Sequence, residues 1–521
     1  MDYGKYFNTR KTPQSQPLPN QVQNNAGGYS FQVDKWMLLD RFLILGTEGG
    51  SYYVGEQALT VENARAAYEC IQEDGVRVVD RVVEISVQGR AAKNDPALYV
   101  LAMAAGTGNL ATRRYALSYL SEVARTGTHL FTFVDYVQQF RGWGRALKNA
   151  VGNWYLDRPI EKLAYQAIKY RNRKGWTHAD VLRKAHPKAH NQLQNDLFKW
   201  IVDGDVPSIQ LVQAFEAAKT ASEDDLVALI AQYDLPREAL PTEALNSPKV
   251  WRSLLVHMPL MALVRNLGKL SNVGVVAPGR WVEIEHTVGM LTNRQKIQQS
   301  RIHPIQVLAA LTTYSQGRGV RGSLTWDVVP EIVAALNTTY EMAFDNVEPS
   351  GKRTLVALDV SSSMTWGEVS GVPGLTPRVA AAAMAMMTIK TEPYTLPLAF
   401  STKPTPMHLN KSMSLNEVIR EMERTRFGGT DCALPMLWAL ENKAEVDLFV
   451  VYTDSETWYG KIHPVQALQM YREQMGIPAK LAVVGMMANK FSIADPNDPG
   501  MLDFVGFDTS VPQALAEFAK M

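Results

Sequence analysis

The sequence of 521 residues is poor in cysteine and has no long apolar run. Its two cysteines, Cys70 and Cys432, argue against a disulfide framework and are typical of a protein from a reducing compartment. No stretch approaches the ~18 apolar residues that a membrane-spanning helix needs. The polar start, residues 1–25, also lacks the apolar core of a signal peptide. We therefore predict a cytoplasmic protein without a membrane partner.

The usual signatures of catalysis are also missing. The glycine-rich turn at residues 46–53 is not followed by the G-K-[ST] of a phosphate-binding loop. His303, His408 and His463 are scattered, without a nucleophile pattern around them. An enzyme stays open as an alternative, because Asp359 and Asp454 could hold a catalytic metal, as in a phosphatase or nuclease. No second acidic cluster accompanies them to form a two-metal site, so we favour a protein that is not an enzyme.

A net charge of +1 conceals one strongly basic stretch. Residues 141–190 hold 12 Lys and Arg against 3 Asp and Glu, a local charge of +9. A block this basic in a nearly neutral protein indicates a polyanion as partner. The alternative is a set of solvated helix faces that bind nothing.

Two consecutive helices are predicted within this stretch, the first from residue 157 and the second from Thr177, a good N-cap. Lys162 and Lys169 are seven residues apart and so share a face of the first helix. Trp176 either stacks on a base or, as we favour, packs the two helices together. Cations gather at the neighbouring ends of the two helices, where they suit the phosphates of structured RNA or DNA: Arg171, Arg173, Lys174, Arg183, Lys184, His186 and Lys188.

A second pattern, D-x-S-x-S, follows a predicted strand at residues 354–358. Asp359, Ser361 and Ser363 form it, at the strand end where ligands of open α/β sheets bind. Downstream, Thr430 precedes a predicted helix, and Asp454 ends another predicted strand. These residues offer only oxygen donors, a set that suits Mg²⁺, Ca²⁺ or Mn²⁺ and is poor for zinc. We predict a metal site, with capped turns that hold no metal as the alternative.

The periodicity changes once along the chain. From about residue 61 to 340 it is helical, with short polar loops, which indicates an α-solenoid of HEAT-like helix pairs. After residues 348–351, predicted strands alternate with helices, which favours a doubly wound, mostly parallel sheet. We therefore predict a flexible tail at 1–28, a helical-repeat domain at 29–346 and an α/β domain at 347–521.

Specific motifs in this order resemble a known family. The run at residues 169–186, K-Y-x-x-R-x-G-W-x-H-x-D-x-L-R-x-x-H, is similar to the TROVE module of the Ro autoantigen family, as are residues 125–133, 142–147 and 258–269. The later pattern resembles the metal-ion-dependent adhesion site (MIDAS) of a von Willebrand factor A domain, which follows the TROVE module in that family. The compact length is most similar to the bacterial members.

The resemblance implies an RNA-binding scaffold, a ribonucleoprotein component that is monomeric as a protein and acts in RNA quality control. Helical repeats would close into a ring sealed by the A domain. Small Y RNA would bind the basic outer surface, and single-stranded 3′ ends of misfolded non-coding RNA would enter the central hole. Polynucleotide phosphorylase or another exoribonuclease is the implied partner.

The same resemblance assigns roles to individual residues. It makes Lys169, Arg173 and His186 the first candidates for Y RNA contact, extended by Lys162, Arg171, Lys174 and Arg183. Arg265 and Lys269 are expected RNA contacts near the ring, although the sequence does not show whether they face the hole. The implied cofactor is a divalent cation, Mg²⁺ before Ca²⁺ or Mn²⁺, at Asp359, Ser361, Ser363, Thr430 and Asp454. An adhesion-type module that binds protein through the metal alone is the remaining alternative.

Overall fold

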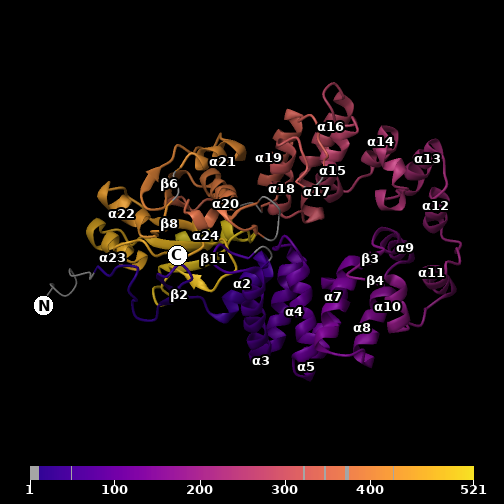
Figure 1. Ribbon diagram of the computed structural model, residues 1–521, viewed down its shortest axis with the longest axis horizontal. Helices are drawn as coiled ribbons and strands as arrows, with labels where there is room; N and C mark the ends of the chain where they lie inside the picture. The colour runs from indigo at the N-terminus through magenta and orange to yellow at the C-terminus, as the bar shows by residue number, and fades with distance from the viewer. Residues whose placement is uncertain (1–10, 48–49, 321–322, 345–347, 370–374, 426–427) are drawn as a thin grey trace.

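The computed structural model describes residues 11–47, 50–320, 323–344, 348–369, 375–425 and 428–521. A helical domain, residues 35–342, curves away from an α/β domain, residues 353–520, and returns to it (Figure 1). The outgoing part of the helical domain is here called the first arm and the returning part the second arm. The fold therefore has the two predicted parts in the predicted order.

The first arm contains α2 (Lys35–Leu45), α3 (Glu56–Gln88), α4 (Asp95–Thr107), α5 (Leu110–Ser118), α6 (Leu120–Val123), α7 (Gly127–Phe140), α8 (Arg145–Leu156), α9 (Ile160–Lys169), the hairpin β3 (Asn172–Arg173) and β4 (Trp176–Thr177), α10 (His178–Ala185), α11 (Gln192–Asp203), α12 (Gln210–Ala218) and α13 (Glu223–Tyr233). The second arm contains the 3₁₀ turns η1 (Arg237–Ala239) and η2 (Glu243–Asn246), then α14 (Pro248–Val256), α15 (Leu260–Asn272), α16 (Trp281–Leu291), α17 (Arg294–Ser300), α18 (Pro304–Ser315) and α19 (Pro330–Met342).

Short polar residues determine where many of these helices begin. The Asn109 side chain accepts a hydrogen bond of 2.9 Å from the Thr112 amide at the start of α5. Thr177 and Asp180 form a capping box at the start of α10. Such caps satisfy amides that have no partner within the helix. The apolar faces behind them are buried, as Val82, Leu101 and Phe131 show.

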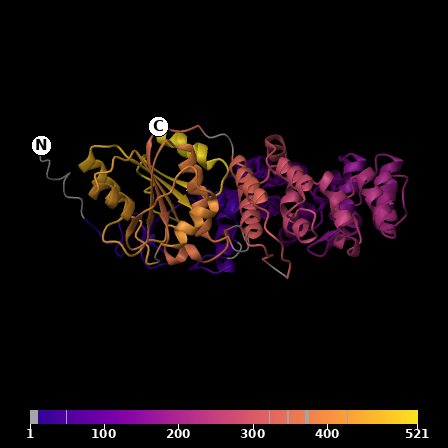
Figure 2. The ribbon, with the colours of Figure 1, turned by 90° about the horizontal axis from the view of Figure 1, so that it is seen from above.

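The α/β domain is built on a sheet with the strand order β11-β9-β8-β5-β6-β7 in the described residues, parallel except for β7. Helices lie on both sides of the sheet (Figure 2). The elements of the α/β domain are β5 (Arg353–Asp359), η3 (Ser362–Thr365), α20 (Pro377–Thr391), β6 (Tyr394–Phe400), β7 (Pro404–Pro406), α21 (Leu415–Glu423), α22 (Leu434–Glu441), β8 (Leu448–Thr453), α23 (Pro464–Met475), β9 (Lys480–Gly485), β10 (Phe491–Ser492), β11 (Met501–Val505) and α24 (Val511–Lys520).

The two faces of this sheet belong to different cores. Because side chains alternate along a strand, Leu355 and Ala357 of β5 point to one face, and Val356 and Leu358 to the other. The first pair packs into a core confined to the α/β domain and to the N-terminal residues Leu18 and Phe31. The second pair belongs to a core that is continuous with that of the helical domain. The two domains therefore share buried apolar surface.

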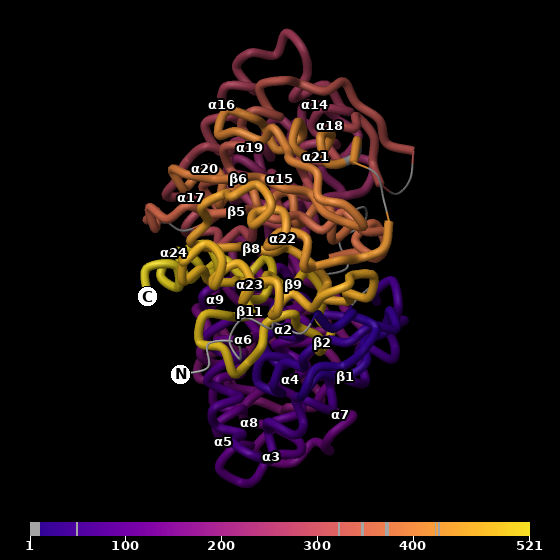
Figure 3. Tube along the Cα trace, turned by 90° about the vertical axis from the view of Figure 1, so that its left-hand side faces the viewer, coloured from indigo at the N-terminus to yellow at the C-terminus, as the bar shows by residue number. Residues whose placement is uncertain are grey.

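The N-terminal segment differs from its prediction as a flexible tail over residues 1–28. Residues 1–10 lie outside the described part. Residues 11–28, which include β1 (Val22–Gln23), pack against the α/β domain, and β2 (Tyr29–Gln32) follows them (Figure 3). Gln14 is fully buried, and its Nε2 donates to Asp431 Oδ1 over 2.8 Å. Strand β2 pairs with β10. The prediction was wrong for residues 11–28 because these polar side chains find their partners more than 400 residues away.

The second arm returns to the beginning of the first arm at the loop between α3 and α4, residues 89–94. His303 Nε2, at the start of α18, donates to the Arg90 carbonyl over 3.0 Å, and Gln306 Nε2 donates to the Ala92 carbonyl over 2.8 Å. The Arg90 guanidinium forms a two-pronged ion pair with Asp508 of the α/β domain. Both arms and the α/β domain therefore join at this loop, which closes the helical domain into a ring.

We expect replacement of Arg90 by Ala to destabilise the protein by about 3–5 kcal/mol, because the charge of Asp508 would then be buried without its partner. The Asp508 side chain is only 6% exposed. Chemical denaturation followed by circular dichroism measures the change. Arg65→Ala is the control, since its ion pair with Glu69 lies on the surface and the Arg65 side chain is 80% exposed. A denaturation curve of Arg90→Ala that matched this control would show that the ion pair with Asp508 contributes nothing to stability.

Candidate nucleic-acid interface and metal site

The basic stretch forms an exposed surface on the first arm, here called the outer surface. Helix α9 ends at Lys169, and the cations that were expected at a helix end follow on the β3–β4 hairpin. Lys174 and Gly175 both have positive φ, at 54° and 79°, which is the backbone of a tight hairpin turn. This turn leaves Arg173 and Lys174 exposed.

The predicted RNA-contact residues of this surface divide into two groups. Lys162, Arg173 and His186 are exposed, and His186 ends α10 in a left-handed conformation. The other four also contact the protein itself. Lys169 Nζ donates to the Tyr165 hydroxyl over 3.1 Å, Arg171 donates to the Glu238 carbonyl, Arg183 donates to the Val202 carbonyl over 3.1 Å, and Lys174 Nζ lies 5.4 Å from the Tyr136 ring centre.

Trp176 is half-buried, and its ring lies 6.3 Å from the ring of Trp143. It packs against the helical core, which agrees with the packing role that we favoured over base stacking. Beneath the hairpin, His178 is buried and its Nδ1 lies 2.9 Å from the Tyr155 hydroxyl. Burial lowers the pKa of His178 to about 4. This histidine of the matched motif is therefore a neutral core residue that supports the hairpin.

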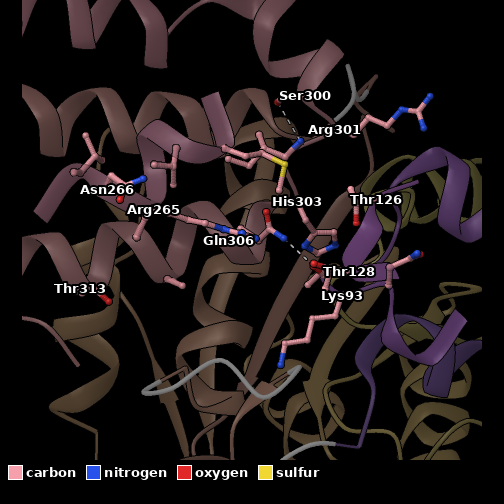
Figure 4. A pocket seen from close by; sticks show the side chains of 18 of the residues that line it. Lys93, Thr126, Thr128, Arg265, Asn266, Ser300, Arg301, His303, Gln306 and Thr313 are labelled. Atoms are coloured by element: carbon pink, nitrogen blue, oxygen red, sulfur yellow. Dashed lines mark hydrogen bonds between the residues drawn. The ribbon is translucent and has the colours of Figure 1, made fainter. Parts of the chain in front are cut away.

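A cavity of about 1410 Å³ lies between the two arms (Figure 4). Arg265 and Lys269 of α15 line it, so both predicted residues face the hole. Four further cations reach it from other elements, and Asp95 is the one carboxylate in the described lining: the cations are Lys93, Arg125, Arg237 and Arg301. Tyr170 and Trp326 add aromatic surface.

The electrostatics of the cavity favour an anion. Burial, and then the neighbouring Arg301, lower the pKa of the Arg125 guanidinium. The positively charged side chains of the lining therefore repel one another in a partly enclosed space. Sequence reasoning missed these four cations because each stands alone in its segment. Only Arg125 belonged to a quoted motif, residues 125–133.

The structure brings the five predicted metal ligands to one edge of the sheet. Asp359 ends β5, and its Oδ1 accepts a 2.9 Å hydrogen bond from the Ser361 amide. The hydroxyls of Ser361 and Ser363 lie 3.1 Å apart. The Ser362 amide donates to the Gly428 carbonyl over 3.4 Å. All five predicted ligands are buried: Asp359, Ser361, Ser363, Thr430 and Asp454.

The loop that follows β8 completes this edge. It carries Asp454, and the amides of Trp458 and Tyr459 both donate to the Thr430 carbonyl, at 3.0 and 3.1 Å. The three ligand-bearing loops are therefore in mutual contact. Sequence reasoning missed Glu456, which is buried in the same loop with one carboxylate oxygen that has no hydrogen-bond partner in the described structure.

The electrostatics of this edge favour a cation. Burial, and then the neighbouring Asp454, raise the pKa of the Asp359 carboxyl, and burial raises that of Asp454. Two carboxylates with hydroxyls around them match the donors that hard cations prefer. Within the described residues, no group of three or more His, Cys, Asp or Glu is placed to hold a metal ion. The five predicted donors are carboxylate and hydroxyl oxygens, which suit a hard cation better than zinc.

No helix in the described part of the chain is long and apolar enough to cross a membrane. Cys70 and Cys432 are both free and buried.

Comparison with known proteins gives consistent matches along the chain. The family model of the TROVE domain matches residues 22–226 and 234–352, and that of the Ro60 vWA domain matches residues 353–519. A protein of Deinococcus radiodurans named RNA-binding protein RO60 is 42% identical, over 99% of this chain and 98% of its own. A protein of the same name from Caenorhabditis elegans is 37% identical, over 96% of this chain and 90% of its own.

Among solved structures, the crystal structure of the Deinococcus radiodurans RO (RSR) protein matches with a TM-score of 0.72 and 42% identity, covering 94% of this chain and 99% of that one. The predicted fold class, a helical domain followed by a doubly wound α/β domain, is confirmed. The names of the relatives describe RNA binding and no reaction, which agrees with the interpretation that the chain is not an enzyme. Two matching family models and these full-length relatives establish that the chain belongs to the Ro60 family, in which a TROVE domain precedes a von Willebrand factor A domain.

Proposed function

We propose that this chain is an RNA-binding scaffold with two distinct RNA sites. The observation that carries the proposal is the cavity between the arms, where six cations face one carboxylate. The exposed basic hairpin on the first arm supplies the second site. Both relatives are named RNA-binding proteins, which supports the same conclusion.

The outer surface is suited to structured RNA. Exposed basic side chains on the hairpin and at a helix end can contact phosphates without reading base sequence. Lys162, Arg173 and His186 provide these contacts with their side chains in solvent, whereas Arg171 and Arg183 also hold backbone carbonyls. We propose Y RNA as the structured ligand on the basis of the family resemblance.

The cavity is suited to a single strand. Cations that follow a phosphate backbone, combined with aromatic rings that stack on bases, are the usual features of single-strand sites. Arg265 and Lys269 provide charge, while Tyr170 and Trp326 provide rings. We propose that the 3′ end of misfolded or structured non-coding RNA enters here. The protein would then act in RNA quality control with an exoribonuclease, such as polynucleotide phosphorylase, as its partner.

The edge of the α/β domain is proposed to bind Mg²⁺ or a similar hard cation, with Ca²⁺ and Mn²⁺ as close alternatives. Asp359, Ser361, Ser363, Thr430 and Asp454 would hold it. A bound cation would supply a positive charge that relieves the repulsion between the two carboxylates. We also propose a cytoplasmic location, since the two cysteines are free.

Replacing Lys162, Arg173 and His186 together by Ala should weaken binding of structured RNA and leave the melting temperature nearly unchanged. Each lost phosphate contact should reduce the slope of log K against log salt by about one unit. Filter binding at several salt concentrations measures both quantities. The control replaces Lys403 and Lys411, which are exposed on the α/β domain, and changes the net charge equally at pH 7. Equal loss of affinity in both variants would mean that this surface is only a solvated face.

Replacing Arg265 and Lys269 by Gln should weaken binding of single-stranded oligouridine at least about tenfold and reduce its salt slope by about 1.4 units. Binding of structured RNA to the outer surface should persist. The matched control is Arg65→Gln with Arg114→Gln, two exposed arginines outside the cavity lining. Fluorescence anisotropy with labelled RNA measures each affinity. Unchanged oligouridine binding in the cavity variant would rule out this site.

Replacing Asp359 by Ala should abolish divalent cation binding and the cation-dependent rise in melting temperature, because stabilisation by a ligand requires its site. Calorimetric titration with Mg²⁺ measures the binding. RNA binding to the outer surface should survive. Asp431→Asn is the control, since Asp431 holds Gln14 instead of contributing to the donor set. Unaltered cation affinity in Asp359→Ala would contradict the site, and RNA cleavage that depends on Asp359 would favour the nuclease alternative.

A direct test of the whole proposal is to sequence the RNA that copurifies with the protein from its own cell. Enrichment of one small structured RNA together with RNAs that end in unpaired 3′ tails is the expected result. Recovery of bulk cellular RNA without enrichment would contradict the two-site scaffold.

A further inference from the structure

The two arms of the ring are also linked on the side away from the α/β domain, where α9 lies (Figure 1). Helix α9 of the first arm packs against α12 and against η1, where the second arm begins. Arg171, which follows α9, donates a hydrogen bond to the Glu238 carbonyl of η1. The two residues are 67 apart in sequence. This bond therefore joins the first arm directly to the second.

The Arg171 side chain is engaged with the protein on several sides. Its Nε donates to the Ile168 carbonyl over 3.3 Å, and its Cζ lies 5.0 Å from the centre of the Phe215 ring. The residue is exposed, but it is not among the described residues that line the cavity. These contacts suit a link between the arms better than they suit a phosphate contact.

The residues next to the bonded pair both line the cavity. Tyr170 immediately precedes Arg171 in the first arm. Arg237 immediately precedes Glu238 in the second arm, and the cavity lining includes both Tyr170 and Arg237. Arg237 Nη1 in turn donates over 2.7 Å to Oδ1 of Asn266, a cavity residue of α15. The bond of Arg171 therefore holds the backbone beside an aromatic ring and beside a guanidinium, which are the groups that stack on a base and contact a phosphate.

We propose that Arg171 is a positioning residue of the single-strand site. By holding the Glu238 carbonyl, it sets Tyr170 and Arg237 relative to each other, so that a base stacks on the ring while a phosphate meets the guanidinium. This inference rests on the RNA cavity proposed above. It also separates Arg171 from the exposed cations with which the sequence grouped it. Loss of the Arg171 side chain would keep every cation of the described lining and would loosen two lining residues.

The test measures the affinity of the full-length Arg171→Ala variant for labelled oligouridine at several salt concentrations, by fluorescence anisotropy. Binding should be about three- to tenfold weaker, the effect of one lost hydrogen bond. The slope of log K against log salt should stay at the wild-type value, because no phosphate contact is removed. The matched control is Arg113→Ala, since the exposed Arg113 also donates to a backbone carbonyl, that of Gly108, over 2.6 Å and lies outside the described cavity lining. The control should bind like wild type.

Two results of this titration would overturn the proposal. A slope reduced by about 0.7 units would show that Arg171 contacts a phosphate of the single strand. Affinity equal to that of Arg113→Ala would show that the bond to Glu238 does not affect the site. Oligouridine binding that persists unchanged in the variant with Arg265→Gln and Lys269→Gln would instead refute the cavity as the RNA site.

A double-mutant cycle tests whether Arg171 acts through Tyr170. In a Tyr170→Leu background, Arg171→Ala should weaken oligouridine binding much less than it does in wild type, because the ring that it positions is gone. Full additivity of the two substitutions would contradict the positioning role. A further measurement needs no variant to fold: in wild-type protein, oligouridine should slow amide hydrogen exchange at residues 170–172 and 237–239 together. Slowing in only one of these segments would also overturn the link.

Discussion

The joint at residues 89–94 is the contact on which the rest of the structure depends. Arg90 uses its carbonyl to hold the second arm through His303 and its guanidinium to hold the α/β domain through Asp508. Burial lowers the pKa of His303 to about 4, so its ring is neutral and keeps Nε2 as a donor at neutral pH. The two arms and the α/β domain therefore share one boundary at this loop, beside the cavity.

The cavity between the arms and the proposed metal site carry unbalanced charges of opposite sign. In the cavity, cations such as Arg125 and Arg301 face one another with one carboxylate in the described lining. At the sheet edge, Asp359 and Asp454 are buried together. Such arrangements cost free energy in the empty protein and are relieved by a ligand of the opposite charge. An RNA phosphate and a hard cation are the ligands that we propose for the cavity and for the sheet edge, respectively.

That the proposed metal donors meet at one edge of the sheet could be predicted because two rules operate together. A carboxylate or hydroxyl directly after a buried strand is recognisable locally, and the carboxyl ends of parallel strands meet at one edge of a sheet. The first ordered segment could not be predicted in this way. Gln14 and Asn24 belong to a polar stretch that looks like a tail, and their partners Asp431 and Thr457 are distant in sequence. The hairpin at residues 172–177 could not be predicted either, because only one of its two residues with positive φ, Gly175, is a glycine.

The sequence by itself determined the order of the two domains, the family, the D-x-S-x-S donors and the existence of a basic surface, since each depends on neighbouring residues or regular spacing. Only the tertiary structure decided that Arg265 and Lys269 face the cavity and that Lys93 and Arg301 join them. Helical periodicity shows which side chains share a face within one helix. Which face points inward is set by packing against helices that are far away in the chain, and no local pattern records that packing.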